Sequence, residues 1–206
     1  MKVILVNGSP REKGCTYTAL AEVAGALEKQ GIETEFFWLG KKPIAGCLDC
    51  GVCFKTGKCF MDDPVNLFLD KSHDADGFIF GSPVHYAAPS GALASFMART
   101  FYGGKHNFRG KPAAGIVSCR RGGSTAAVDQ INKFFTISQM PIVSSQYWNM
   151  VHGNTPAEVK QDLEGMQIMR TLGNNMAWLL KCIEAGQAAG IRLPELEKPA
   201  RTNFIR

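Results

Sequence analysis

Four cysteines gather in one short segment, where closely spaced thiols suit metal or redox chemistry. Cys47, Cys50, Cys53 and Cys59 are separated by two, two and five residues. Thiolates held this closely are suitable ligands for a [4Fe-4S] cluster. A tetrahedral zinc site is an alternative, although structural zinc more often uses two separated cysteine pairs. Free or redox-active thiols are a third interpretation, so the spacing predicts a thiol-based site without fixing its occupant.

A second candidate site lies near the start of the chain. The apolar run 3–6 leads into Asn7-Gly8-Ser9-Pro10-Arg11, and a segment of helical period begins at Thr16. The first amides of a helix have no partner within it and carry the positive end of its dipole, so this loop can bind an anion. The side-chain donors that we expect there are Ser9, Arg11, Cys15, Thr16 and Tyr17.

The pattern of this loop restricts the kind of phosphate that it would bind. The Lys-Ser/Thr ending of a nucleotide-triphosphate loop and the Gly-x-Gly-x-x-Gly pattern are both missing from it. A monophosphate therefore fits the loop better than a diphosphate or a triphosphate. The alternative interpretation is an ordinary turn between a strand and a helix, with Thr16 as its cap.

Strand and helix patterns alternate along the chain and must position these residues. Strands are predicted over 3–6, 32–39, 75–83, 113–118 and 141–147. Helices are predicted over 16–30, 64–72, 90–102, 125–137 and 155–185. This alternation predicts an α/β fold, in which a parallel sheet has helices on both faces. Ligands of such sheets bind at the carboxyl ends of the strands, so we expect the site there.

Composition indicates a single domain with one long insertion. The chain has 206 residues, 45% of them hydrophobic, which is enough for a sizeable core. We predict one domain over 1–186, a cysteine-rich insertion loop over 39–63, and a tail or oligomerisation arm over 187–206. No signal peptide and no membrane-spanning run is evident, so we expect a cytoplasmic protein with reduced cysteines and no membrane partner.

The charge distribution argues against nucleic-acid binding. The net charge is +5, and the basic residues are scattered along the chain instead of forming runs with interleaved aromatic residues. A weak attraction for anionic cofactors is all that this charge supports.

Three motifs in order resemble one protein family. Gly8-Ser9-Pro10-Arg11, Gly81-Ser82-Pro83-Val84 and the cysteine motif with Asp62-Asp63 behind it resemble the flavodoxin-like NADPH-dependent FMN reductases. The resemblance covers about residues 1–150 and is closest to the cysteine-containing branch that includes the iron-sulfur flavoproteins. It implies a doubly wound, five-stranded parallel sheet of order 2-1-3-4-5, with FMN as cofactor and NAD(P)H as electron donor.

The resemblance also implies positions for the parts of the flavin. Ser9, Arg11, Cys15, Thr16 and Tyr17 fall where the family binds the FMN phosphate. The residues expected beside the isoalloxazine ring are Pro83, Val84, His85 and Tyr86 on one side and Ser118, Arg121, Gly122 and Gly123 on the other. A solvent-exposed loop histidine is the alternative for His85. The family's compact cysteine motif matches Cys47, Cys50, Cys53 and Cys59, which implies a [4Fe-4S] cluster.

The resulting hypothesis is an FMN-dependent oxidoreductase in which the flavin carries the chemistry and no side chain acts as acid or base. Hydride from NAD(P)H would reach the flavin, and electrons would pass to a quinone, a free flavin, an iron-sulfur centre or another small-molecule or protein acceptor. Alternatives are an electron carrier between protein partners, with or without the cluster, and a thiol redox sensor. Relatives often form dimers or tetramers, so a homodimer or homotetramer is expected.

Overall fold

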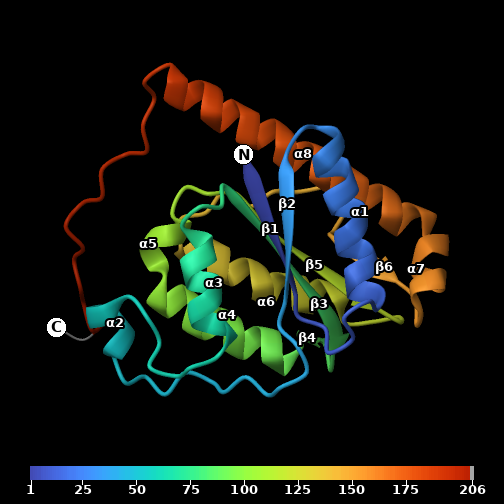
Figure 1. The fold of residues 1–206 in the computed structure, drawn as a ribbon, viewed down its shortest axis with the longest axis horizontal. Helices are drawn as coiled ribbons and strands as arrows, with labels where there is room; N and C mark the ends of the chain where they lie inside the picture. Colours follow the sequence, from blue (N-terminus) through green and yellow to red (C-terminus); the bar gives the residue numbers. More distant parts are fainter. Residues whose placement is uncertain (205–206) are drawn as a thin grey trace.

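A parallel sheet forms the centre of the molecule in the computed structural model, which describes residues 1–204 (Figure 1). Its strands lie in the order β2-β1-β3-β5-β6. Their bounds are Lys2–Asn7 for β1, Glu33–Trp38 for β2, Gly77–His85 for β3, Ala113–Cys119 for β5 and Met150–His152 for β6. The two-residue strand β4, Ala88–Pro89, pairs antiparallel with the end of β3. Counting the parallel strands alone, the predicted order 2-1-3-4-5 is confirmed.

Four helices occupy the places predicted for them. They are α1 (Cys15–Lys29), α3 (Pro64–Ser72), α4 (Gly91–Gly103) and α6 (Ser124–Ile137). Asp63 caps α3 by accepting a hydrogen bond from the amide of Val65 at 3.1 Å, with proline in the first turn. The further helices of the described chain are α2 (Val52–Thr56), α5 (Lys105–Phe108), α7 (Pro156–Gln161) and α8 (Leu163–Ala188).

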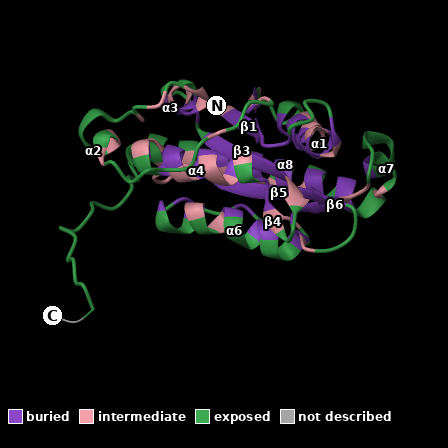
Figure 2. Ribbon diagram, turned by 90° about the horizontal axis from the view of Figure 1, so that it is seen from below, coloured by how far each residue is buried: buried purple, intermediate pink, exposed green. Residues whose placement is uncertain are grey.

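The alternation of side chains along each strand builds one core on each face of the sheet. Val3 and Leu5 point to the face covered by α1 and α8, and Ile4 and Val6 point to the face covered by α3, α4 and α6. All four are fully buried. Figure 2 shows the strands buried between helices whose outer surfaces are exposed. Because both faces are covered, the central strands β1, β3 and β5 are mainly apolar, whereas the edge strand β2 carries Glu33 and Glu35.

The fifth strand predicted over 141–147 is wrong. That segment makes only an isolated bridge between Ile142 and Ala113, and the last strand is β6, with Val151 fully buried beside Ser118 of β5. The polar residues of the segment bond to α8 instead of joining a ladder. The Ser145 hydroxyl donates to the carbonyl of Ile168 at 2.7 Å.

The helix predicted over 155–185 is divided in two at Asp162. Thr155 begins α7 as expected, because its hydroxyl accepts a hydrogen bond from the amide of Glu158. The Asp162 carboxylate then accepts from the amides of Gly165, at 2.9 Å, and His152, at 2.7 Å. It therefore caps α8 and fixes the end of β6 at the same time, which ends one helix and starts the next.

Beyond α8 the chain is extended. Residues 191–204 have no helix or strand and are exposed. In Figure 1 they run along the edge of the molecule from the end of α8 toward α2, and Arg109 Nη2 donates to the carbonyl of Pro194 at 2.5 Å. The function of this tail remains a prediction. Within residues 1–204 no helix is both long enough and apolar enough to cross a bilayer.

Candidate functional site

A pocket of about 310 Å³ opens at the carboxyl edge of the sheet. Strand β1 lies between β2 on one side and β3 on the other, so the strand order reverses direction at β1. The pocket lies at this switch point, where such sheets bind ligands. Its volume falls in the range of small-molecule sites. It is lined by Ser9, Pro10, Arg11, Cys15, Thr16, Pro83, Val84, His85, Ser118, Cys119, Arg120, Gly153 and Asn154.

The loop after β1 is tied to the neighbouring elements through Gly8. The Gly8 amide donates to the carbonyl of Gly81 at 2.8 Å, and the Ser90 hydroxyl donates to the Gly8 carbonyl at 2.8 Å. A Cβ at Gly8 would lie 2.8 Å from the Cβ of Leu93. Only glycine therefore allows the loop to lie this close to α4.

Ser9 organises the next turn of the same loop. Its amide donates to Asn7 Oδ1 at 3.0 Å, and its hydroxyl accepts from the Arg11 amide at 3.1 Å. Trp38 Nε1 donates to the Ser9 carbonyl at 2.8 Å. Because the hydroxyl oxygen of Ser9 is used as an acceptor, its proton is available to a ligand in the pocket.

Helix α1 starts at the pocket without a side-chain cap. Its N-cap residue is Gly14, which has no side chain to bond the first amides. The amides of the first turn and the positive end of the helix dipole therefore face the space between the loops. An anion placed there would supply the missing cap.

Two contacts join the start of α1 to the strands on the far side of the pocket. The hydroxyls of Thr16 and Ser118 are 2.9 Å apart and buried. The Cys15 thiol donates to the carbonyl of Gly153 with a sulfur–oxygen distance of 3.7 Å. The loops after β5 and β6 are thus held against α1.

The side chains of the pocket favour an anionic ligand. Arg11 and Arg120 line it together with His85, and among its described lining residues none is acidic. Burial raises the pKa of both Cys15 and Cys119. Both are therefore protonated at neutral pH and do not add negative charge.

Eight of the residues predicted for the flavin site line this pocket. They are Ser9, Arg11, Cys15, Thr16, Pro83, Val84, His85 and Ser118. The side chain of Tyr17 instead packs against Phe36, with 5.1 Å between ring centroids, and lies under Lys13 Nζ at 3.8 Å. It lines a separate groove beside α7 and α8.

The other predicted residues surround the pocket without lining it. Tyr86 is fully exposed on the turn between β3 and β4, where Tyr86 and Ala87 have φ of +50° and +59°. Gly123 supports this turn, since an added Cβ would lie 2.8 Å from the Cα of Ala87. Arg121 and Gly122 are exposed outside the pocket.

Some lining residues were missed by sequence reasoning. They are Pro10, Cys119, Arg120, Gly153 and Asn154. Gly153 and Asn154 directly follow β6, so placing the last strand at 141–147 removed them from consideration. The short apolar pair Met150-Val151 followed by His152-Gly153-Asn154 was the signal that could have found them.

The four cysteines of the insertion line a second, small pocket of about 20 Å³. It lies between α2, its flanking loops and α4, and Figure 1 places α2 at the opposite end of the molecule from the start of α1. Burial raises the pKa of the Cys53 thiol, and so does its proximity to Cys47, Cys59 and Cys50. The thiols therefore converge on one space.

The chemistry of this pocket suits a soft metal centre. The Asp49 amide donates to Cys47 Sγ at 3.4 Å, and the Arg99 guanidinium donates to Cys59 Sγ. N–H donors aimed at sulfur are typical of the surroundings of thiolate ligands. As the side chains stand, no group of three or more His, Cys, Asp or Glu within residues 1–204 has the arrangement of a metal site. A cluster would therefore require a different arrangement of the four thiols from the one in this structure.

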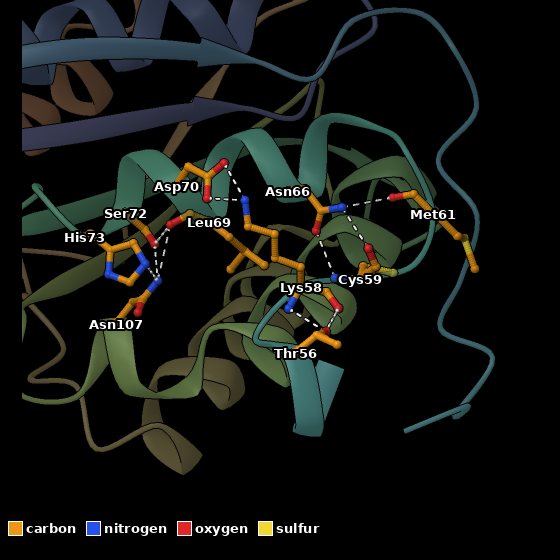
Figure 3. A network of polar contacts seen from close by, with 10 residues as sticks. All are labelled: Thr56, Lys58, Cys59, Met61, Asn66, Leu69, Asp70, Ser72, His73 and Asn107. Atoms are coloured by element: carbon orange, nitrogen blue, oxygen red, sulfur yellow. Dashed lines mark hydrogen bonds and ion pairs between the residues drawn. The ribbon is translucent and has the colours of Figure 1, made fainter. Parts of the chain in front are cut away.

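Cys59 is fixed to α3 through Asn66 (Figure 3). Asn66 Oδ1 accepts from the Cys59 amide at 2.8 Å, and Asn66 Nδ2 donates to the carbonyls of Cys59, at 2.8 Å, and Met61, at 3.2 Å. The backbone of the fourth cysteine is thus held by a helix of the main fold. Cys47 and Cys50, by contrast, are exposed.

Comparison with known proteins identifies the family and the fold of the chain. The sequence profile of the NADPH-dependent FMN reductase family matches residues 1–155. An iron-sulfur flavoprotein of Methanocaldococcus jannaschii is 34% identical over 89% of this chain and 100% of its own length. Among solved structures, a flavone reductase gives a TM-score of 0.68 at 18% identity, covering 89% of this chain and 64% of that chain. An archaeal flavodoxin gives 0.59 at 16% identity, covering 88% and 99%.

Proposed function

Because the chain belongs to the NADPH-dependent FMN reductase family, we propose that it is an FMN-dependent oxidoreductase that takes hydride from NAD(P)H. Electrons would then pass to a quinone, a flavin or an iron-sulfur acceptor. Family membership supports the flavin-dependent oxidoreductase. The nicotinamide donor and the acceptor are the parts of the proposal that need direct measurement.

The observation that carries the proposal is the cationic pocket around the uncapped start of α1. Arg11, the Ser9 hydroxyl and the first amides of α1 are suited to hold the phosphate of FMN. Pro83, Val84 and His85, at the end of β3, form a wall suited to the flat ring. Arg120 supplies positive charge from the end of β5, which would favour a reduced, anionic ring.

When bound, the flavin supplies hydride and electron transfer, which no side chain of this chain provides alone. The protein's part is to bind and orient the cofactor. The Thr16–Ser118 pair and the Cys15–Gly153 contact hold the loops of the pocket against the start of α1. The protonated thiols of Cys15 and Cys119 avoid placing negative charge beside the cofactor.

We further propose that Cys47, Cys50, Cys53 and Cys59 hold a [4Fe-4S] cluster. Their convergence on one pocket and the N–H donors aimed at Cys47 and Cys59 support this assignment, as does the iron-sulfur flavoprotein name of the relative. Iron, sulfide and zinc assays on anaerobically purified protein test it. Iron and sulfide in equal amounts are expected; zinc or metal-free thiols would contradict the assignment.

The activity is tested on FMN-loaded protein by following NADPH and NADH oxidation with a quinone or free flavin as acceptor. Steady turnover that depends on FMN is expected. Binding of FMN without turnover with any of these acceptors would contradict an enzyme and favour the second candidate. That candidate is an electron carrier between protein partners.

One observation favours the carrier. Leu48, Phe54 and Phe60 line the cysteine pocket and are all more than half exposed. An apolar rim around a redox centre suits contact with a protein partner. Two measurements distinguish the functions. An enzyme should oxidise NAD(P)H with small acceptors, whereas a carrier should instead take electrons from a reduced electron-transfer protein.

We also propose that the protein assembles as a homodimer or homotetramer. The extended tail supports this, because Leu193 and Leu196 on it are more than half exposed. Sedimentation of the full chain and of a chain ending at Ala189 measures the subunit number. A monomer in both cases would contradict the proposal.

A further inference from the structure

Arg99 of α4 is a buried cation beside the cysteine pocket. Its side chain is 1% exposed. Nε and Nη2 donate to Cys59 Sγ at 3.3 Å and 3.1 Å, and Nη1 donates to the carbonyl of Ala45 at 3.3 Å. The planar guanidinium thus aims a fork of two N–H groups at one cysteine sulfur, which a lysine cannot do.

Asp63 holds the other edge of the same guanidinium. Its carboxylate accepts hydrogen bonds from Nη1 and Nη2 of Arg99, the latter at 3.0 Å, and it also caps α3 through Val65. Burial lowers the pKa of Arg99, but hydrogen bonds to Asp63 and Cys59 outweigh it and the net shift is upward. Arg99 therefore stays charged, with Asp63 offsetting part of its charge.

We propose that Arg99 and Asp63 are positioning residues that set the reduction potential of the cluster through opposite effects on Cys59. This inference rests on the proposed cluster. Hydrogen bonds to ligand sulfurs and net local charge are among the factors that determine iron-sulfur potentials. The Arg99 fork stabilises the more negative, reduced cluster and raises the potential. Asp63 weakens that effect and lowers it.

Substitutions of Arg99 and Asp63 should shift the reduction potential in opposite directions, which distinguishes this role from simple support of the fold. Asp63→Asn removes the offsetting charge but keeps a good helix cap, because Asn and Asp are equally favoured at that position. It should therefore raise the potential. Arg99→Lys keeps the charge but cannot bond Cys59 twice while also binding Asp63, so it should lower the potential.

Lys58→Gln is the matched charge control. Lys58 precedes Cys59 in the chain, but its ammonium pairs with Asp70 at 2.8 Å, with both side chains 55% exposed (Figure 3). Solvent and salt screen such a charge. Its removal should leave the potential unchanged, although it changes the net charge as much as Asp63→Asn does.

The test is a potentiometric titration of the reconstituted full-length protein, with dithionite supplying the electron and EPR detecting the reduced cluster. At the wild-type midpoint, Asp63→Asn should increase the ratio of reduced to oxidised cluster by about tenfold or more, which is 59 mV for one electron. Arg99→Lys should decrease that ratio by about threefold or more. Iron and sulfide content confirm that each variant holds its cluster.

The two proposals fail in different ways. If wild-type protein takes up no iron and sulfide, the cluster assignment is overturned, and this inference with it. If the cluster is present but both variants keep the wild-type potential, or shift in the same direction, only this inference is overturned. If Arg99→Lys fails to fold, the potential of Asp63→Asn compared with that of Lys58→Gln still tests this inference.

Discussion

The hydroxyl oxygens of Thr16 and Ser118 lie 2.9 Å apart, and this contact joins the first turn of α1 to the end of β5. The two residues are 1% and 3% exposed. One hydroxyl donates to the other, so a single proton of the pair is left to point into the pocket. The phosphate side and the ring side of the proposed flavin site are therefore built as one unit.

Arg11→Ala should weaken FMN binding by about 10- to 100-fold, because a charge-assisted hydrogen bond to phosphate contributes about 1.5–3 kcal/mol. Quenching of flavin fluorescence measures the dissociation constant. Riboflavin, which lacks the phosphate, should bind both proteins equally. Lys29→Ala, at the far end of α1, controls for net charge. Equal loss of riboflavin and FMN affinity would place Arg11 elsewhere in the site.

Arg120 and Arg121 should differ, although they are neighbours in the chain. Only Arg120 lines the pocket. Arg120→Ala should lower the two-electron reduction potential of bound FMN by about 30 mV, which is a tenfold change in equilibrium constant. Arg121→Ala should leave the potential unchanged. A larger shift from Arg121→Ala in the same dye-equilibration assay would instead place Arg121 beside the ring, as the family resemblance implies.

Asn66→Ala should shorten cluster retention under a chelator by about tenfold or more, a typical effect of removing support from metal ligands. Asn107→Ala is its control, because Asn107 Nδ2 also bonds α3, at Leu69 and Ser72, but away from the cysteines (Figure 3). Both substitutions should lower the free energy of unfolding by about 1–3 kcal/mol. Similar iron loss from both variants would show that retention merely follows stability.

Glu35 should make stability depend on acid pH. Hydrogen bonds from Lys2, at 2.5 Å, and Lys71, at 2.6 Å, hold the pKa of Glu35 below its ordinary value. A lowered carboxyl pKa stabilises the fold above the unfolded pKa of about 4.3, and this stabilisation is lost as pH falls through the folded pKa. Glu35→Gln should therefore cost about 1 kcal/mol at pH 7 and nothing at acid pH below the folded value.

Urea unfolding of the wild-type protein and of Glu35→Gln, from pH 7 down to acid pH below the folded pKa of Glu35, measures this effect. Glu33→Gln is the control, since the Glu33 side chain is 69% exposed and lies 3.8 Å from Lys2 Nζ. It should leave the free energy of unfolding unchanged. A Glu35→Gln deficit that persists at the lowest pH would mean that the charge pairs are not its cause.

Much of the fold followed from the sequence because local signals agreed with tertiary packing. Asp63-Pro64 marks the start of α3, and the apolar run 113–118 forms a strand that is buried on both faces. The end of the chain was different. Asp162 ends α7 through bonds to His152 and Gly165, and no local pattern reveals a partner that is ten residues away.

The candidate site was predictable to the extent that its loops follow recognisable strands. Ser9, Arg11 and His85 follow such strands and line the pocket. Tyr17 follows the same strand but lies outside the pocket, because its ring packs against Phe36. Arg99 was overlooked because it lies inside an apolar helix, where only the structure shows that Asp63 and Cys59 surround it.

The close approach of Gly8 to Leu93 has a kinetic consequence. With its amide and carbonyl already engaged by Gly81 and Ser90, the turn after β1 has little freedom left to lose when a ligand arrives. Binding to such a preorganised turn incurs a small entropic penalty. Cofactor capture should then proceed at an ordinary encounter rate, and differences in affinity among pocket variants should appear mainly as differences in residence time.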